Sequence, residues 1–380
     1  MFPRDEYDWR IAKAHAAMDA AAVDLLLIDS GELLAWLTGY TVSETMYRAA
    51  LLPRQGQPWF VLRELDEAPC RKKTWIADVI GFADIDDPHQ AVADSIRAHG
   101  FADARIGADV NAYSFSAHTA ARLKACLPRA EFIALPGISD SLRWIKSPRE
   151  ITVLKDASAI ADKAMRAIAQ NVRVGSSTRA AAATAAATFL LEGADSGETG
   201  PIVKASGNHE FLHGAFKGEL LGVGDILHVE LIPRVDGYGA RLMRPIAIGD
   251  TTVKLRDIAA RIIAVQDEQI EAMKPGALAR DVDAITRQGL IASGLRPRYD
   301  NVTAYTLGLY TRTPRTSDFS RAFLPDADWP LEEGMVFHVY ATAARLGFSE
   351  TVVVTPEGGR RLTATARQLL TAHQSGFQRG

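Results

Sequence analysis

Residues 228–249 read HVELIPRVDGYGARLMRPIAIG, and this stretch is typical of two strands joined by a turn. The first strand carries one carboxylate, Glu230, and a Val-Asp-Gly-Tyr turn follows it. The second strand begins near Arg241, a residue that stays protonated at any ordinary pH. The stretch therefore predicts a hairpin that carries a carboxylate on one strand and a guanidinium on the other.

The composition of the whole chain excludes several classes of protein. Its 380 residues exceed one typical hydrophobic core and indicate two domains, and the hydrophobic share of 47% fits a soluble globular protein. A net charge of −3 gives no basic surface for nucleic acid, and no apolar run approaches the length of about 20 residues that spans a membrane. The first residues lack the apolar core of a signal peptide, and Cys70 and Cys126 form no CxxC pair. We expect a cytoplasmic protein.

The chain changes its pattern near residue 145. Strand and helix patterns alternate over 1–145, which predicts a layered α/β domain. Ser147, Pro148 and Glu150 then form the capping signature of a helix start. Beyond it, over 146–380, helices and strands come in separate blocks, which indicates an α+β domain.

Several short motifs, in this order and spacing, resemble one known superfamily. They are LAWLTGY, KSPREI, ASGNHEFLHG, the hairpin quoted above, EEGMVFHV and GFSETVVVTPEGG. The chain is similar to the creatinase, prolidase and methionine aminopeptidase superfamily, which has the pita-bread fold. The resemblance implies an α+β fold in which the C-terminal pita-bread catalytic domain follows a smaller α/β N-terminal domain of the creatinase type.

The resemblance also implies a metal site, and this sequence departs from it. The peptidases of the superfamily bind two metal ions with two Asp, one His and two Glu. Carried over position by position, these ligands fall on Glu230, Arg241, Tyr305, Tyr340 and Glu350. Hard cations need several oxygen ligands, and tyrosine, with a pKa of about 10, is a poor ligand near neutral pH. We therefore expect no metal ion and no other cofactor.

A different metal motif occurs at residues 209–213, which read HEFLH. This pattern binds zinc when it lies on a helix, where residues four apart share a face. Gly207 and Gly214 flank it and argue against a helix interior. His213 has another reading, because the catalytic histidine of creatinase precedes a Gly-Asp pair by the interval that separates His213 from Gly224. We expect His213 to be a general acid/base, with a structural histidine as the alternative.

Creatinase and ectoine hydrolase, two relatives in the superfamily, imply a metal-independent function. They suggest a hydrolase of a non-peptide C–N bond in a small nitrogen-rich zwitterion: a cyclic amidine, guanidino acid or amide. Glu230 and Glu350 are expected to point into one cavity, where they pair with a cationic substrate group or attack its carbon. His213 would carry the proton to the leaving nitrogen. Met243, where creatinase has a carboxylate, disfavours creatine itself.

Five further residues are expected to bind substrate: Arg241, Tyr305, His338, Tyr340 and Arg48. Arg241 would hold a glutamate ionised or bind a substrate carboxylate, and a plain salt bridge to Glu230 is the alternative. The two tyrosines donate hydrogen bonds or simply fill the core. Arg48 matches a creatinase arginine that reaches the neighbouring subunit's active site, which implies a homodimer, and a surface arginine is the alternative.

Two questions stay open at this level. The long segment between the matched motifs carries Arg312, Arg315 and Arg321, any of which can bind an anionic substrate group. The function also has two alternatives: an Xaa-Pro metallopeptidase with atypical ligands, and an inactive homologue that binds a small molecule.

Overall fold

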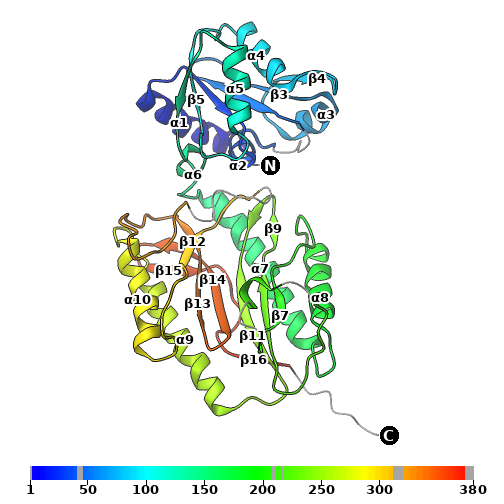
Figure 1. The fold of residues 1–380 in the computed structure, drawn as a ribbon, viewed down its shortest axis with the longest axis vertical. Helices are drawn as coiled ribbons and strands as arrows, with labels where there is room; N and C mark the ends of the chain where they lie inside the picture. The colour runs from blue at the N-terminus through cyan, green and yellow to red at the C-terminus, as the bar shows by residue number, and fades with distance from the viewer. Residues whose placement is uncertain (1, 41–45, 208–210, 215–216, 311–319, 373–380) are drawn as a thin grey trace. The chain divides into compact units, whose positions relative to one another are not determined.

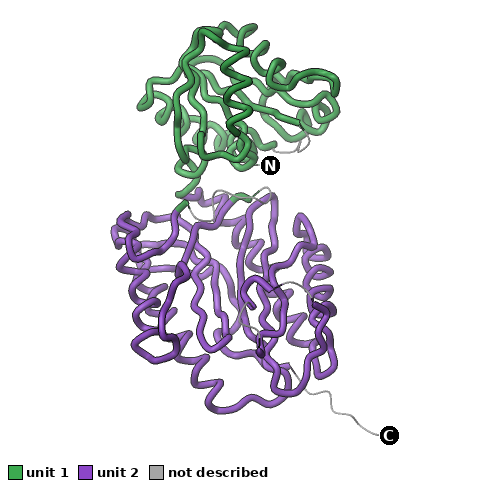
Figure 2. Tube along the Cα trace, viewed as in Figure 1, with its two compact units in different colours: residues 1–144, 309–320 green, residues 145–308, 321–380 purple. Residues whose placement is uncertain are grey.

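The computed structural model describes residues 2–40, 46–207, 211–214, 217–310 and 320–372. The chain forms two compact units (Figure 2), one of residues 1–144 and 309–320 and one of residues 145–308 and 321–380. No described helix is long and apolar enough to cross a membrane. The elements of the two units agree with the fold class predicted from the sequence, an α/β domain followed by an α+β domain.

The first unit is a six-stranded mixed sheet in the order β4-β3-β2-β1-β5-β6, with helices packed against it (Figure 1). The strands are β1 (Leu25–Ile28), β2 (Ala49–Pro53), β3 (Trp59–Arg63), β4 (Asp78–Phe82), β5 (Arg105–Ala108) and β6 (Glu131–Ala134). The helices are α1 (Arg4–Ala21), α2 (Gly31–Thr38), α3 (Glu64–Lys73), α4 (Pro88–Ala98), α5 (Ala117–Cys126) and α6 (Ile138–Ser141). Its central strands are apolar throughout because both of their faces are covered.

The second unit contains the larger sheet, in the order β12-β13-β14-β11-β8-β7. The strands are β7 (Ile202–Lys204), β8 (Ile226–Leu231), β9 (Arg234–Val235), β10 (Tyr238–Gly239), β11 (Leu242–Ile248), β12 (Ala304–Thr306), β13 (Val336–Ala343), β14 (Leu346–Thr355), β15 (Gly358–Arg361) and β16 (Leu370–Ala372). The helices are α7 (Pro148–Asn171), α8 (Thr178–Leu191), the short 3-10 turn η1 (Phe211–His213), α9 (Val253–Glu271) and α10 (Ala279–Ala292).

The long helices of this unit cover one face of the sheet, which we call the helix-covered face. Helices α7 and α8 pack on Leu227, Val229 and Leu231, and α9 packs on Ala341 and Phe348. Strand side chains alternate between the two faces, so the residues next to these along each strand point to the other side. We call that other side the site face.

The hairpin predicted at residues 228–249 is confirmed. Strands β8 and β11 pair antiparallel with Glu230 opposite Met243, and the small β9-β10 pair extends the turn. Asp236 and Gly237 both have positive φ, of 48° and 80°, as a tight hairpin turn of this type requires. The capping box at the start of α7 is confirmed as well, since Ser147 and Glu150 exchange their hydrogen bonds.

Candidate active site

Two rows of side chains run across the site face of the large sheet. The first row follows directly opposed residues from β8 to β13: Glu230, Met243, Ser349 and Tyr340. The second row contains Arg241, Thr351 and His338, each two residues from a member of the first row, and Tyr305, which lies opposite His338 on β12. Residues opposed across a sheet, or two apart on a strand, share a face. The pairing therefore brings eight side chains from five chain segments onto one surface.

An ion pair occupies one end of these rows. Arg241 donates from Nη1 to Oε1 of Glu230 at 2.8 Å, and the side chains are 13% and 4% exposed. The Thr351 hydroxyl forms two hydrogen bonds with the Arg241 backbone, accepting one from its N–H and donating one to its carbonyl oxygen. Gly200 packs so closely on Glu230 that an added Cβ would lie 2.9 Å from the Glu230 Cγ. Backbone and neighbours thus fix this pair in place.

Aromatic rings form the other end of the rows. The rings of Tyr305 and Tyr340 meet edge to face at 6.0 Å, and His338 lies 5.0 Å from the first and 5.2 Å from the second. The Arg241 guanidinium lies 5.4 Å from the centre of the Tyr305 ring, within the range of a cation–π contact. Burial, with the charge of Arg241, lowers the pKa of His338 well below its usual value, and burial raises the pKa of Tyr340. His338 is therefore an uncharged imidazole, and Tyr340 a phenol, at neutral pH.

Two fully buried side chains in these rows have no hydrogen-bond partner among the described residues. They are His338, at both ring nitrogens, and Ser349, at Oγ. Buried polar atoms are satisfied in most proteins, and each one left unpaired costs about 1–3 kcal/mol. Ser349 was not predicted from the sequence, and the strand pairing identifies it.

The structure corrects the prediction for Glu350. Met243 lies opposite Ser349, which places Ser349 on the site face and the next residue, Glu350, on the helix-covered face. Its carboxylate is fully buried and accepts from Arg244 at 2.6 Å, from Arg367 at 2.8 Å and from Thr363. The expectation that Glu230 and Glu350 point into one cavity is wrong, because the two side chains lie on opposite sides of the sheet.

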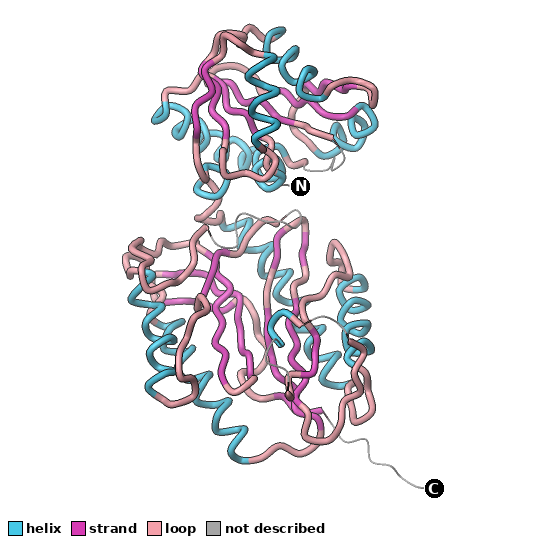
Figure 3. Tube along the Cα trace, in the orientation of Figure 1, coloured by secondary structure: helices cyan, strands magenta, loops and turns pink. Residues whose placement is uncertain are grey.

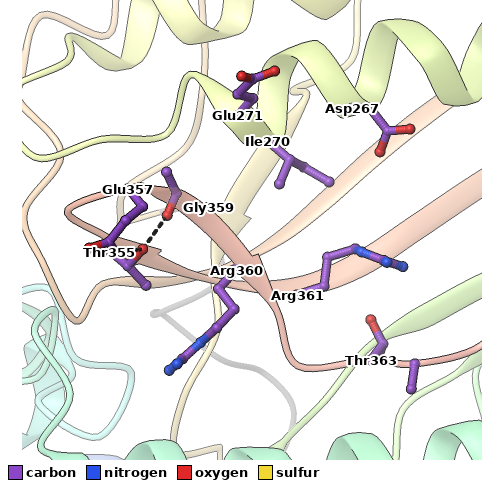
Figure 4. Close-up of a pocket in the computed structure, with 11 residues that line it drawn as sticks. Asp267, Ile270, Glu271, Thr355, Glu357, Gly359, Arg360, Arg361 and Thr363 are labelled. Carbon is purple, nitrogen blue, oxygen red and sulfur yellow. Dashed lines mark hydrogen bonds between the residues drawn. The ribbon is translucent and has the colours of Figure 1, made fainter.

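A hollow of about 700 Å³ does occur near Glu350, on the helix-covered side. Figure 4 shows it between the end of α9 and the β14-β15 hairpin, lined by Arg361 and Thr363 among others. The eight residues of the two rows do not line it. The hollow and the two rows are therefore separate features.

His213 lies at the edge of the candidate site. It is exposed, on the turn η1, and Figure 3 shows this turn crossing in front of the sheet. Its neighbour Leu212 packs against the cluster of Met243, Tyr305 and Tyr340. His209 and Glu210 of the HEFLH motif lie outside the described residues. Leu212 thus contacts the rows, while the side chain of His213 is exposed to solvent.

The other predicted arginines lie elsewhere or are not described. Arg48 belongs to the first unit, where it donates to the Asp29 carbonyl at 3.2 Å. Arg312 and Arg315 lie outside the described residues. Arg321 is half-buried, and its guanidinium stacks 4.6 Å from the Trp329 ring centre. These residues remain predictions for substrate binding.

The side chains of the rows do not suit the two-metal centre that the fold implies. A divalent ion needs three or more good donors, and the eight side chains offer one carboxylate, Glu230, already bonded to a guanidinium. Arg241 is a fixed cation, and the buried Tyr340 holds its proton. Among the described residues, no group of three or more His, Cys, Asp or Glu is arranged to hold a metal ion.

Comparison with known proteins agrees with the fold and gives the family. Residues 152–356 match the model of metallopeptidase family M24, and residues 10–145 match the creatinase/prolidase N-terminal domain. An uncharacterized peptidase, YqhT, of Bacillus subtilis is 26% identical over 95% of this chain and 99% of its own. An Xaa-Pro dipeptidase of Pyrococcus furiosus is 29% identical over 63% of this chain and 69% of its own. The structure of an Xaa-Pro dipeptidase from Bacillus anthracis superposes with a TM-score of 0.80 at 21% identity, over 96% of this chain and 99% of that one.

Proposed function

This chain belongs to metallopeptidase family M24, and we propose that it hydrolyses a C–N bond of a small nitrogen-rich molecule without the two-metal centre of the family's peptidases. The observation that carries the proposal is the Arg241–Glu230 ion pair, with 2.8 Å between Nη1 and Oε1. A fixed cation takes the place in which a dication would otherwise neutralise this carboxylate. Tyr305 and Tyr340 fill the adjoining space with aromatic rings.

The proposed reaction uses water and the side chains at this pair. Glu230 accepts a proton from a water molecule, whose oxygen bonds to the carbon of the scissile C–N bond. Arg241 stabilises the negative charge that develops on the substituent of that carbon. His213 donates a proton to the nitrogen as the C–N bond breaks, which yields an acid and an amine or their equivalents. With Glu350 on the other face, Glu230 is the one carboxylate of the two rows available as base or nucleophile.

Other parts of the prediction belong to the same proposal. We propose that two copies form a homodimer and that Arg48 of the partner subunit contacts the substrate. A cytoplasmic location is proposed from the sequence.

The experiment is a substrate screen in the presence of a strong chelator, covering cyclic amidines, guanidino acids, lactams, N-acyl amino acids and Xaa-Pro dipeptides. Turnover of a non-peptide compound supports the proposal.

The names of the relatives favour a second candidate, an Xaa-Pro peptidase. Turnover of Xaa-Pro dipeptides that stops with chelator would establish that candidate, and binding without turnover of any compound would establish the inactive homologue.

A further inference from the structure

The eight side chains of the two rows carry one negative and one positive charge, and these pair with each other. Glu230 and Arg241 are hydrogen-bonded at 2.8 Å, and Glu350 is paired with Arg244 and Arg367 on the opposite face of the sheet. A guanidinium or amidinium group on the site face would meet the like charge of Arg241, with no unpaired carboxylate in the rows to balance it. Burying a charge without a partner is among the costliest steps in binding.

The same rows also contain two uncharged side chains that can form hydrogen bonds. His338 is fully buried and opposes Thr351, and Ser349 is fully buried and opposes Tyr340. The ring nitrogens of His338 and Oγ of Ser349 lack partners among the described residues. A neutral imidazole offers one donor and one acceptor, and a hydroxyl offers both.

The surroundings of these two side chains favour a flat group. The Tyr340 ring lies 22° from the plane of the His338 ring, and the Tyr305 ring meets the His338 ring edge-on at 75°. Met243 completes an apolar border in the same cluster. Aromatic walls with a few placed polar atoms are the usual lining of a small-molecule site.

We infer that His338 and Ser349 form an uncharged hydrogen-bonding subsite that takes a neutral planar amide or lactam group of the substrate. The carbonyl oxygen of such a group accepts a hydrogen bond and its N–H donates one, which matches what the two side chains offer. This inference rests on the proposed function and narrows its substrate class from cyclic amidines, guanidino acids and amides to the uncharged amides.

The test compares two ring compounds of the same shape that differ in charge, 2-pyrrolidinone, a neutral lactam, and 2-iminopyrrolidine, an amidine protonated near neutral pH. Binding of each to the full chain is titrated by ligand-observed NMR with chelator present. We expect the lactam to bind at least about tenfold more tightly, since an unpaired buried charge costs more than 1.4 kcal/mol. Equal or tighter binding of the amidinium compound, or no lactam binding, overturns the inference.

Substitutions at Ser349 and His338 test whether lactam binding depends on these two side chains. Ser349→Ala and His338→Phe each remove hydrogen-bonding atoms, and we expect each to weaken lactam binding by about 2- to 10-fold. Ser158→Ala is the matched control, because Ser158 is equally buried but lies on α7 with its hydroxyl bonded to Leu154. Unchanged lactam affinity in Ser349→Ala and His338→Phe, with thermal melts that show folded protein, contradicts the inference. Binding is measured without turnover, so metal-dependent peptidase activity would refute the proposed function by a separate result.

Discussion

Arg241 changes the chemistry of its surroundings because it is bonded to a carboxylate that is itself buried. The side chains of Arg241 and Glu230 are 13% and 4% exposed. If either one is removed, water therefore solvates the remaining charge poorly. A buried ion pair adds little net stability, whereas one buried charge left alone costs several kcal/mol. The pair therefore constrains the site more strongly than it stabilises the fold.

Removing the Arg241 guanidinium should therefore destabilise the protein more than removing both charges of the pair. We expect Arg241→Met to lower the free energy of unfolding by about 3–5 kcal/mol, because Glu230 loses its partner, and the double variant with Glu230→Leu to regain most of the loss. Urea unfolding measures both. Arg298→Met is the control, since its pair with Asp300 is exposed and should contribute about 0–1 kcal/mol. A loss in Arg241→Met no larger than in the control would contradict the account of the pair.

His213 and Glu230 are predicted to act on the reaction. His213→Ala should lower kcat by about 10²- to 10⁴-fold and leave the Tm unchanged, because the side chain is exposed. Glu230→Gln should lower kcat at least as far, since an amide cannot accept the proton from water. Steady-state kinetics on the substrate found in the screen measures both, with His118→Ala, exposed in the first unit, as the control. Full activity in either variant removes that residue from the mechanism.

Among the elements of the fold, strand β14 shows best where sequence reasoning stops. The run from Ser349 to Thr355 has the pattern of a strand, and the sequence also predicts the hairpin of β8 and β11. Which face each residue takes depends on the register with β11, set by contacts far away in the chain. If the register shifted by one residue, Glu350 would point to the site face in place of Ser349. The motif does not fix the register, so the prediction from it assigned the wrong residue to the site face.

Glu350 is thus predicted to matter for stability. We expect Glu350→Gln to lower the free energy of unfolding by about 3–5 kcal/mol, because Arg244 and Arg367 then lose a buried carboxylate. Glu357→Gln, at an exposed position of the same hairpin, should change it by less than about 0.5 kcal/mol. Chemical unfolding gives the comparison, with kcat measured under folding conditions. Loss of kcat in Glu350→Gln without loss of stability would restore the catalytic role expected from the sequence.

Strand β8 adds a pH dependence through His228. Burial lowers the pKa of His228 from 6.5 to about 3. Between these pH values the imidazole is protonated in the unfolded chain and uncharged in the folded chain. The stability from this residue is complete above pH 6.5 and falls as the pH drops toward 3, by about 1.4 kcal/mol per pH unit. We expect His228→Leu to lose stability less steeply between pH 6.5 and 4.5 than the unchanged chain. Equal slopes in urea unfolding across that range would contradict the assigned burial.

For the whole molecule, composition and motif order were enough to predict the two-part fold and the superfamily. The departures at Arg241, Tyr305 and Tyr340 were also visible in the sequence, and the strand pairing brings them together on one face. The partnerless Ser349 and the exposure of His213 depend on packing, which no local pattern reports. The sequence therefore pointed to part of this group of residues on the site face, and the structure was needed for the rest.

Hydrolysis without a metal centre can be tested on the purified protein. The most direct test measures kcat/KM and bound Mn, Co, Zn and Fe on the same purified protein, before and after dialysis against a strong chelator and again after each metal is added back. We expect less than about 0.1 metal ion per chain after dialysis, with kcat/KM unchanged at every stage, because the rows contain one carboxylate and it is paired with Arg241. Near-stoichiometric metal, with activity lost on removal and restored on return, would contradict it.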